Sequence, residues 1–144
     1  MAIAAFPHTY TVTLAGGELA APPRAPIAAG TPPQFGGTDR VWSPEELLAG
    51  AALLCLQTTY DAMARRDGIA EIGWHGAAIA ILDKTPDGIA FTKIRLDVHV
   101  TTAAGDEHRV EATLRAAERR CIVARALRVP IELTLGIRAA STGL

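Results

Sequence analysis

Residues 42–68 read WSPEELLAGAALLCLQTTYDAMARRDG and predict one long helix around which the rest of the fold is organised. The serine at 43 suits the N-cap position, a proline follows it at the first helical position, and Glu46 completes a capping box with the serine. Gly68 is typical of the residue that ends a helix, here after two arginines and an aspartate. The signals place a central helix over 43–67, roughly 36 Å long at about 1.5 Å per residue.

Cys55 lies in the middle of this helix, among leucine and alanine residues on several faces. Because apolar side chains occupy more than one stripe, we expect the first half of the helix to be buried nearly all round. A buried cysteine is usually a small apolar side chain in a core. The alternative is that Cys55 is a reactive group around which the core is built.

Composition limits the class of protein. The chain has 144 residues, which predicts a single domain over 1–144 with one continuous core. Its hydrophobic content is 49 % but its aromatic content only 5 %, so the core is expected to consist of small aliphatic side chains. The formal charge is −1 and no basic stripe is present, which argues against nucleic acid as a partner.

The sequence also predicts a cytoplasmic protein without a membrane partner. The N-terminal residues lack the basic start and the apolar run of a signal peptide, and no uncharged run reaches the roughly 20 residues of a membrane span. Two cysteines are too few for a disulfide scaffold of a small secreted domain. The four histidines show no metal-ligand spacing, so no metal site is expected at His8, His75, His99 or His108.

Alternating and helical patterns predict the remaining elements. The second helix is expected to bury Cys121, because that residue continues an apolar stripe of Val110, Leu114 and Ala117. Prolines and glycines exclude regular structure from most of the segment before the central helix. The predicted elements are N-terminal strands over 8–28, an active-site loop over 29–42, a hairpin over 70–101, a second helix over 105–128 and a final strand over 130–138.

This order of elements indicates an α+β fold in which consecutive strands form antiparallel hairpins and both helices pack on the sheet. Each helix carries one cysteine on its apolar stripe, so Cys55 and Cys121 could come within disulfide reach, about 4 to 7 Å between Cα atoms. A mid-helix thiol receives no help from a helix N-terminus, so we expect a cation to lower the pKa of Cys55 and an acid to hold that cation.

Both kinds of residue are found just upstream of the thiol. Glu45 and Glu46 stand at the start of the helix, and Arg24 and Arg40 lie in the preceding loop. Glu46 is better explained as the capping residue than as a catalytic acid.

The residues SPEELLAGAALLC, at 43–55, carry a resemblance when they are taken with the second cysteine in AERRCIVARAL and the final strand PIELTLGI. Together these motifs resemble the OsmC/Ohr family of cysteine-dependent hydroperoxide reductases. The similarity extends over nearly the whole chain, from TVTLAGG to IELTLGI, and a proline–glutamate helix start with cysteine ten residues after the glutamate is its most specific part.

The resemblance implies a peroxidase mechanism. Cys55 matches the peroxidatic cysteine, Cys121 the resolving cysteine, and Glu45 the acid that orients a catalytic arginine. In the family the thiolate attacks the O–O bond of a small hydrophobic organic hydroperoxide, an alcohol leaves, and the sulfenic acid condenses with the second thiol. A thiol or dithiol then reduces the resulting Cys55–Cys121 disulfide.

The resemblance also implies an OsmC-like architecture, with antiparallel sheets wrapped around two central helices in an intertwined homodimer. The active sites of such a dimer lie at the subunit interface, which would bury apolar surface of the central helix. No metal and no organic cofactor are implied.

The catalytic arginine does not occupy either position that the family uses. Ohr-type members carry it directly after a Gly-Gly, where this chain has Glu18, and OsmC-type members carry it before an aromatic residue, where this chain has Gln34. Arg40, five residues before Glu45, is the preferred substitute because a guanidinium on a flexible stem can reach the same pocket from another loop position. Arg24 is the alternative.

Other side chains near the site allow two interpretations each. Phe35 and Trp42 flank the helix start and either plug the core or line an apolar substrate pocket. Several arginines surround Cys121, and they either form a solvated helix face or attract an anionic reductant. This group comprises Arg115, Arg119, Arg120, Arg125 and Arg128.

Two other functions compete with peroxidase activity. A non-catalytic relative would be a small-ligand-binding or redox-sensing dimer, and the unfilled arginine positions favour it. A purely structural interaction domain would make the two cysteines a coincidence.

Overall fold

The computed structural model describes residues 3–141. The chain forms two compact units, Met1–Leu47 and Leu48–Leu144, whose boundary falls inside helix α1 (Pro44–Arg66). A single domain over the whole chain therefore stays a prediction.

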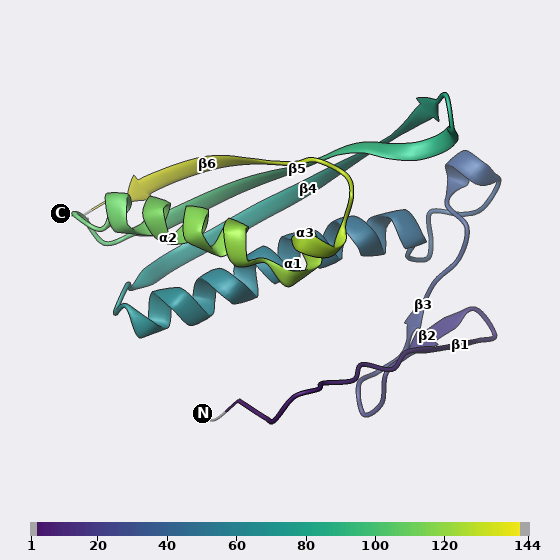
Figure 1. Cartoon of the computed structure of the whole chain (residues 1–144), viewed down its shortest axis with the longest axis horizontal. Coiled ribbons are helices and arrows are strands. Elements are labelled where there is room, and N and C mark those ends of the chain that lie inside the picture. Colours follow the sequence, from purple (N-terminus) through teal and green to yellow (C-terminus); the bar gives the residue numbers. More distant parts are fainter. Residues whose placement is uncertain (1–2, 142–144) are drawn as a thin grey trace. The chain divides into compact units, whose positions relative to one another are not determined.

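The first unit contains a small antiparallel sheet of three short strands, labelled in Figure 1. Strands β1 and β2 form the predicted hairpin around Gly16 and Gly17, whose φ angles of 58° and 76° are both positive. Two successive positive φ angles are what a tight hairpin turn requires, and glycine adopts them without strain. The strands are β1 (Thr13–Ala15), β2 (Glu18–Ala20) and β3 (Ile27–Ala28).

The loop before α1 is ordered by its own backbone. A 3₁₀ turn, η1 (Pro33–Phe35), lies within it, and Gly37 approaches Thr31 so closely that a Cβ atom there would overlap the Thr31 carbonyl. Both ends of the loop are tied together at Trp42, whose N–H donates to Ala28 O at 3.0 Å and whose carbonyl accepts from Gly30 N at 2.9 Å.

Helix α1 begins and ends within one residue of the predicted bounds. The capping box is present, because Ser43 N donates to Glu46 Oε2 at 3.0 Å and Glu46 N donates to Ser43 Oγ at 3.1 Å. Gly68, with φ of 67°, ends the helix, and Ile69 N donates back to Ala64 O at 2.9 Å. This bond satisfies a carbonyl of the last turn that the helix itself leaves unpaired.

The prediction that the first half of α1 is buried all round is wrong for this chain. Its buried residues follow one stripe, including Ala52, Leu56 and Tyr60, while Leu54 is 59 % exposed. By length and composition α1 could span a membrane, with a mean hydropathy of 1.2 over a window of which 33 % is buried. This is weak evidence, because the core helix of a soluble protein passes the same test.

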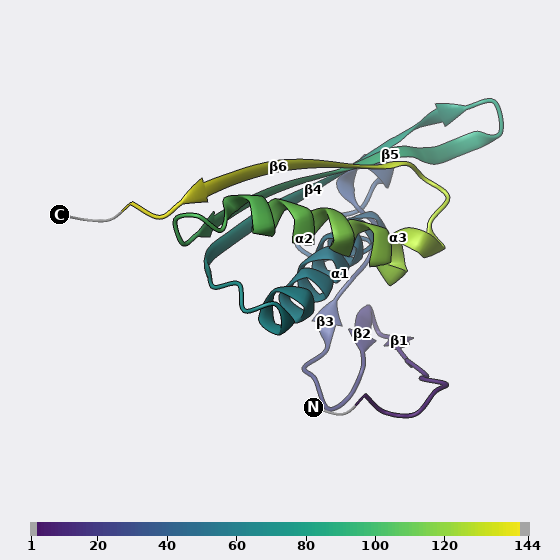
Figure 2. The same ribbon diagram turned by 60° about the vertical axis from the view of Figure 1, so that its left-hand side comes forward.

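The second unit is built on a sheet in the order β4-β5-β6, and α1, α2 and α3 lie on one side of it (Figures 1 and 2). Strands β4 (Glu71–Thr85) and β5 (Gly88–Thr102) form the predicted antiparallel hairpin. Strand β6 (Ile131–Ala139) pairs with β5 in parallel. The α+β class is confirmed, but the sheet is not antiparallel throughout.

The parallel pairing follows from the connection. Between β5 and β6 the chain passes through α2 and α3, which return it to the end of the sheet at which β5 begins. A helical crossover of this kind joins parallel strands, whereas a short hairpin joins antiparallel ones.

The core of the second unit lies between the sheet and the helices. From Ile94 onward every second residue of β5 is buried there, and the alternate positions, such as Lys93 and Arg95, face away from the core, as the sequence pattern predicts. Helix α2 contributes Leu114 and α1 contributes Leu56 to the same cluster. The buried residues of β5 are Ile94, Leu96, Val98, Val100 and Thr102.

The second helix is interrupted at its cysteine. The chain forms α2 (Glu107–Arg120) and α3 (Ile122–Ala126), and Cys121 between them is extended, with φ of −62° and ψ of 114°. One helix over 105–128 is therefore not observed. The break makes Cys121 the residue immediately before the first turn of α3.

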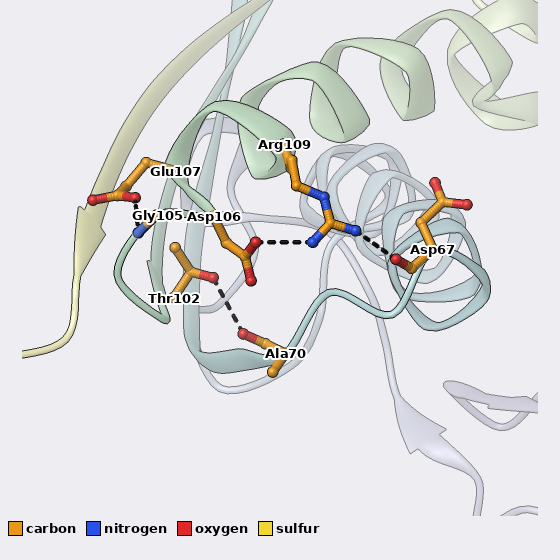
Figure 3. A network of polar contacts seen from close by, with 7 residues as sticks. All are labelled: Asp67, Ala70, Thr102, Gly105, Asp106, Glu107 and Arg109. Atoms are coloured by element: carbon orange, nitrogen blue, oxygen red, sulfur yellow. Dashed lines mark hydrogen bonds and ion pairs between the residues drawn. The ribbon is translucent and has the colours of Figure 1, made fainter.

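A polar network joins the ends of α1, α2 and the sheet (Figure 3). The Arg109 guanidinium donates to Asp106 Oδ1 at 2.8 Å and to the Asp67 carbonyl at 2.6 Å. The Thr102 hydroxyl donates to Ala70 O at 3.2 Å. These contacts hold the end of α1 beside the start of α2.

Candidate active site

The structure brings the two thiols together inside the second unit. Cys55, half-buried on α1, and Cys121, 2 % exposed between α2 and α3, are both free, and their side chains are hydrogen-bonded to each other. The residues are 66 positions apart along the chain (121 − 55). Their contact therefore depends on the packing of the helices.

The environment of Cys55 favours its thiolate. Burial raises the pKa of this thiol, but several hydrogen bonds outweigh burial, so its pKa is lowered from its ordinary value. The donors are the backbone N–H of Val123, the Cys121 thiol, the backbone N–H of Ile122 and the Thr59 hydroxyl. Hydrogen bonds to the charged form of an acid stabilise that form.

The expectation that Cys55 gains nothing from a helix N-terminus is wrong. Ile122 and Val123 are the first two residues of α3, and their N–H groups are among those that a helix leaves without an internal partner. They act on Cys55 because the chain breaks at Cys121 and begins a new helix there. No proline or glycine marks this break, so the sequence carries no signal for it.

Cys121 behaves in the opposite way. Its pKa is raised, chiefly by burial, and the neighbouring Cys55 adds to the effect, while the backbone N–H groups of Ala124 and Val123 oppose it. In the shared hydrogen bond Cys121 therefore keeps its proton and donates it towards Cys55. The pair is asymmetric: the pKa of Cys55 lies below that of Cys121, so Cys55 is the thiol that ionises first.

In the first unit Glu45 presents a carboxylate that lacks a partner. Its Oε2 atom is enclosed and forms no hydrogen bond with the described residues. The Arg40 backbone N–H donates to Thr38 Oγ1 at 3.2 Å, and Arg24 Nη1 donates to Ala21 O at 3.0 Å. Within residues 3–141, neither Arg40 nor Arg24 forms an ion pair with Glu45.

Trp42 and Phe35 are not core plugs in this chain, because they are 53 % and 50 % exposed. Trp42 and Arg40 line the same hollow of about 230 Å³, together with Glu46. Phe35 does not line this hollow. Of the two aromatic residues, Trp42 therefore lines a hollow together with Arg40, the arginine preferred from the sequence.

A second hollow in the molecule lies away from the thiols. It has a volume of about 580 Å³ and is lined by residues of β4, β5 and β6, including His75, His99 and Arg138. Neither cysteine lines it. Across residues 3–141 no cluster of three or more histidine, cysteine or acidic side chains could hold a metal ion.

Comparison with protein families matches residues 37–136 to the family described as OsmC-like protein. The chain belongs to the OsmC-like family. The matched span contains Arg40, Glu45 and both cysteines, and Arg24 lies outside it. Comparison with curated protein sequences finds no significant match.

Solved structures of OsmC-like proteins share the fold. An OsmC-like protein from Mycoplasma pneumoniae has a TM-score of 0.77 at 15 % identity, over 92 % of this chain and 99 % of that one. An organic hydroperoxide resistance protein from Elizabethkingia anophelis has a TM-score of 0.73 at 16 % identity, over 94 % and 99 %. An organic hydroperoxide resistance protein from Legionella pneumophila has a TM-score of 0.71 at 19 % identity, over 91 % and 97 %. At these identities the likeness establishes the fold of this OsmC-like protein, and its chemistry must be argued from its own residues.

Proposed function

We propose that this OsmC-like protein is a thiol-dependent peroxidase that reduces organic hydroperoxides to alcohols through Cys55 and Cys121. The observation that supports the proposal is the asymmetric thiol pair, in which the pKa of Cys55 is lowered and that of its neighbour Cys121 is raised. A peroxidatic cysteine needs a thiolate, and a resolving cysteine needs to lie within reach of the sulfenic acid. The family membership is consistent with this function.

The reaction proceeds in two steps. The Cys55 thiolate attacks one peroxide oxygen of ROOH, the O–O bond breaks, and RO⁻ takes up a proton and leaves as the alcohol. Cys55 is then a sulfenic acid. The Cys121 sulfur attacks the Cys55 sulfur, hydroxide leaves with the Cys121 proton as water, and a disulfide forms. External thiol or dithiol returns two electrons and two protons to the pair.

Arg40 is the arginine that we propose to act with Glu45. The enclosed and unpaired Oε2 of Glu45 supports a cationic partner, because a buried carboxylate oxygen without a hydrogen bond is costly. The shared hollow of Arg40 and Trp42 supports Arg40 over Arg24, whose guanidinium bonds to its own loop. Its role is to hold the hydroperoxide and stabilise the departing alkoxide.

We also propose an intertwined homodimer. Apolar side chains that a single copy leaves in water support a partner of the same kind, among them Leu14 at 68 % exposure, Leu54 at 59 % and Ile122 at 77 %. Such residues occur in both units. We further propose a cytoplasmic location, where a reducing environment would keep the thiol pair ready for reaction.

A non-catalytic redox-sensing or ligand-binding dimer is the second candidate. It is favoured by one observation: within the described chain, no guanidinium is among the groups that shift the pKa of Cys55. The family positions for the arginine hold Glu18 and Gln34 in this sequence. A sensor needs the same thiol pair but no device for releasing an alkoxide.

Mass spectrometry after one equivalent of cumene hydroperoxide tests the peroxidase. The reduced protein should lose two hydrogens within seconds and show a Cys55–Cys121 linkage, and Cys121→Ser should instead accumulate a sulfenic acid on Cys55. Faster oxidation by cumene hydroperoxide than by hydrogen peroxide is expected for an organic substrate. Slow oxidation by both, without preference for Cys55, would leave the sensor or ligand-binding dimer as the better explanation.

The role of Arg40 is tested against Arg24 as the matched control. Arg40→Ala should slow oxidation by hydroperoxide on the order of 100-fold, the usual effect of removing one transition-state donor. Arg24→Ala removes the same charge from the same unit and should retain the rate. Equal rates in the two variants would contradict the assignment.

A further inference from the structure

Another hollow in the second unit, distinct from the one lined by His75 and His99, opens onto Cys121. Its volume is about 270 Å³, and both Cys121 and Ala124 line it, whereas Cys55 does not. Its apolar lining also comes from α1, β5, the segment that leads into β6 and the first residue of β6. These side chains are Leu56, Leu96, Val129 and Ile131.

The charges around this hollow are positive. Arg119 and Arg125 line it, are exposed, and form no ion pair within the described part of the chain. Glu118, the acidic residue among the lining side chains, is paired with Arg115 at 3.6 Å. Two guanidinium groups therefore face the hollow without a compensating acid.

The chemistry of disulfide reduction makes the choice of sulfur important. A thiolate attacks one sulfur of a disulfide along the line of the S–S bond and expels the other, and the thiol of lower pKa is the better leaving group. The pKa of Cys55 is lowered by its hydrogen bonds and that of Cys121 is raised by burial. Attack at Cys121 therefore expels the more stable thiolate.

We propose that this hollow, defined by Cys121, Ala124, Arg119 and Arg125, is the route by which a small thiol carrying a negatively charged group reaches and reduces the oxidised protein. The proposal rests on the proposed peroxidase function, since it concerns the disulfide that this function forms. The two guanidinium groups recognise the anionic group, such as a carboxylate, and the apolar walls accept the carbon chain.

The thiolate of this reductant attacks Cys121 Sγ, the Sγ–Sγ bond breaks, and the electron pair leaves on Cys55. A mixed disulfide then joins the reductant to Cys121. A second thiol attacks the sulfur of the bound reductant, releases Cys121 as a thiolate that takes up a proton, and leaves as a reductant disulfide. Two thiols are oxidised and one protein disulfide is reduced.

The test compares two thiols of different charge and similar size on the full-length protein. The disulfide is first formed with diamide, and its reduction by 3-mercaptopropionate and by 2-mercaptoethanol is followed at matched thiolate concentrations. We expect the anionic thiol to be faster, and the ratio of the two rates to fall roughly tenfold in the double variant R119A/R125A. The ratio should also fall as salt is added.

The matched control is R120A/R128A, which removes two exposed arginines of the same region that do not line the hollow. Its rate ratio should equal that of the unmodified protein. A ratio that falls equally in both double variants would show only a general effect of net charge and would overturn the proposal.

The position of attack gives a second, independent readout. After partial reaction with 3-mercaptopropionate and an acid quench, tryptic peptides should carry the adduct on Cys121, within residues 121–125, and not on Cys55. Adducts found on Cys55 would overturn the proposal. Ala124→Leu, which fills the hollow, should slow both thiols, while Ala126→Leu on the exposed side of α3 should not.

Because diamide forms the disulfide without a hydroperoxide, the two proposals fail separately. Slow oxidation by hydroperoxide with a retained preference for the anionic thiol would remove the peroxidase and leave the access route in place. Fast oxidation by hydroperoxide with no charge preference and adducts on Cys55 would leave the peroxidase and remove the access route.

Discussion

The two sheets of this protein carry similar sequence patterns and differ in what covers them. In β5, Ile94 is 0 % exposed, whereas Leu14 in β1 is 68 % exposed and none of the strands β1, β2 and β3 contains a buried residue. Both segments alternate apolar and polar side chains. Alternation therefore predicts that a strand has an apolar face, but it does not say which element covers that face.

The difference indicates that the strands of the second unit are stabilised by a core of their own, whereas the strands of the first unit contain no buried residue. The proposed homodimer would cover their apolar side chains. Burial of apolar area is the main favourable contribution to folding, and the strands of the first unit obtain little of it from the described chain. Four predictions test this contrast.

The largest effect is expected from the core of the second unit. Leu114→Ala removes a fully buried side chain and should lower the free energy of unfolding by about 2 to 5 kcal/mol. Leu14→Ala, measured at a protein concentration low enough to favour single copies, should change it by less than about 0.5 kcal/mol. Urea unfolding of both variants measures these changes in the free energy of unfolding. Similar losses in the two would contradict the contrast between the units.

The exposed face of the first unit should matter for association. Leu14→Asp places a charge on an apolar surface that the proposed homodimer would bury, so the population should shift from dimer to monomer. Light scattering coupled to size-exclusion chromatography measures the mass. Thr13→Asp, on the neighbouring residue of the same strand, is the control and should retain the mass of the unmodified protein. An unchanged mass for Leu14→Asp would remove β1 from the interface.

The thiol pair, by contrast, should depend on groups within the second unit. Cys121→Ala removes one donor to the Cys55 thiolate, so the pKa of Cys55 should rise and the pH midpoint of its alkylation by iodoacetamide should move upward. Met63→Leu, a volume-conserving change in the core of the same unit, should leave the midpoint in place. A midpoint that does not move in Cys121→Ala would show that the thiols do not interact.

The smallest effect is expected at Tyr60, whose buried hydroxyl forms no hydrogen bond with the described residues. Tyr60→Phe should change the stability at neutral pH by less than about 1 kcal/mol, because no bond is lost. Burial and the nearby Glu71 and Asp61 raise the pKa of Tyr60 to about 12. The raised pKa favours the neutral phenol in the folded state, so stability is lost as the pH rises from about 10 to about 12.

Tyr60→Phe should make this alkaline loss less steep, which thermal unfolding at pH 9 to 12 can measure. Tyr10→Phe, at a side chain that is 88 % exposed, should leave the stability at neutral pH unchanged. An alkaline profile of Tyr60→Phe identical to that of the unmodified protein would show that Tyr60 does not contribute.

Local signals made the elements of this chain predictable. The capping box at Ser43 and the glycine at 68 placed helix α1 within one residue, and the Gly16-Gly17 pair identified the first hairpin. These signals act between residues that are near in sequence, so the sequence contains all the partners. The burial around α1 was overestimated because apolar residues on several faces do not reveal whether a partner covers each face.

Features that depend on contacts between residues far apart in the chain were harder to predict from the sequence. The parallel pairing of β6 depends on where the crossover through α2 and α3 leaves the chain, and the helix break at Cys121 has no proline or glycine to mark it. Because the helix break is not visible in the sequence, the groups that lower the pKa of Cys55 were not predicted correctly. A cation was expected, whereas the described structure supplies backbone N–H groups of Ile122 and Val123.

By itself the sequence determined the α+β class, the central helix, the apolar stripes that carry Cys55 and Cys121, and the resemblance to a family, because these follow from periodicity and from motifs along the chain. Only the tertiary structure decided that the two thiols interact, which of them has the lower pKa and which hollow reaches Cys121. Those properties depend on burial and on hydrogen bonds between residues far apart in sequence, and such contacts exist only once the helices have packed on the sheet.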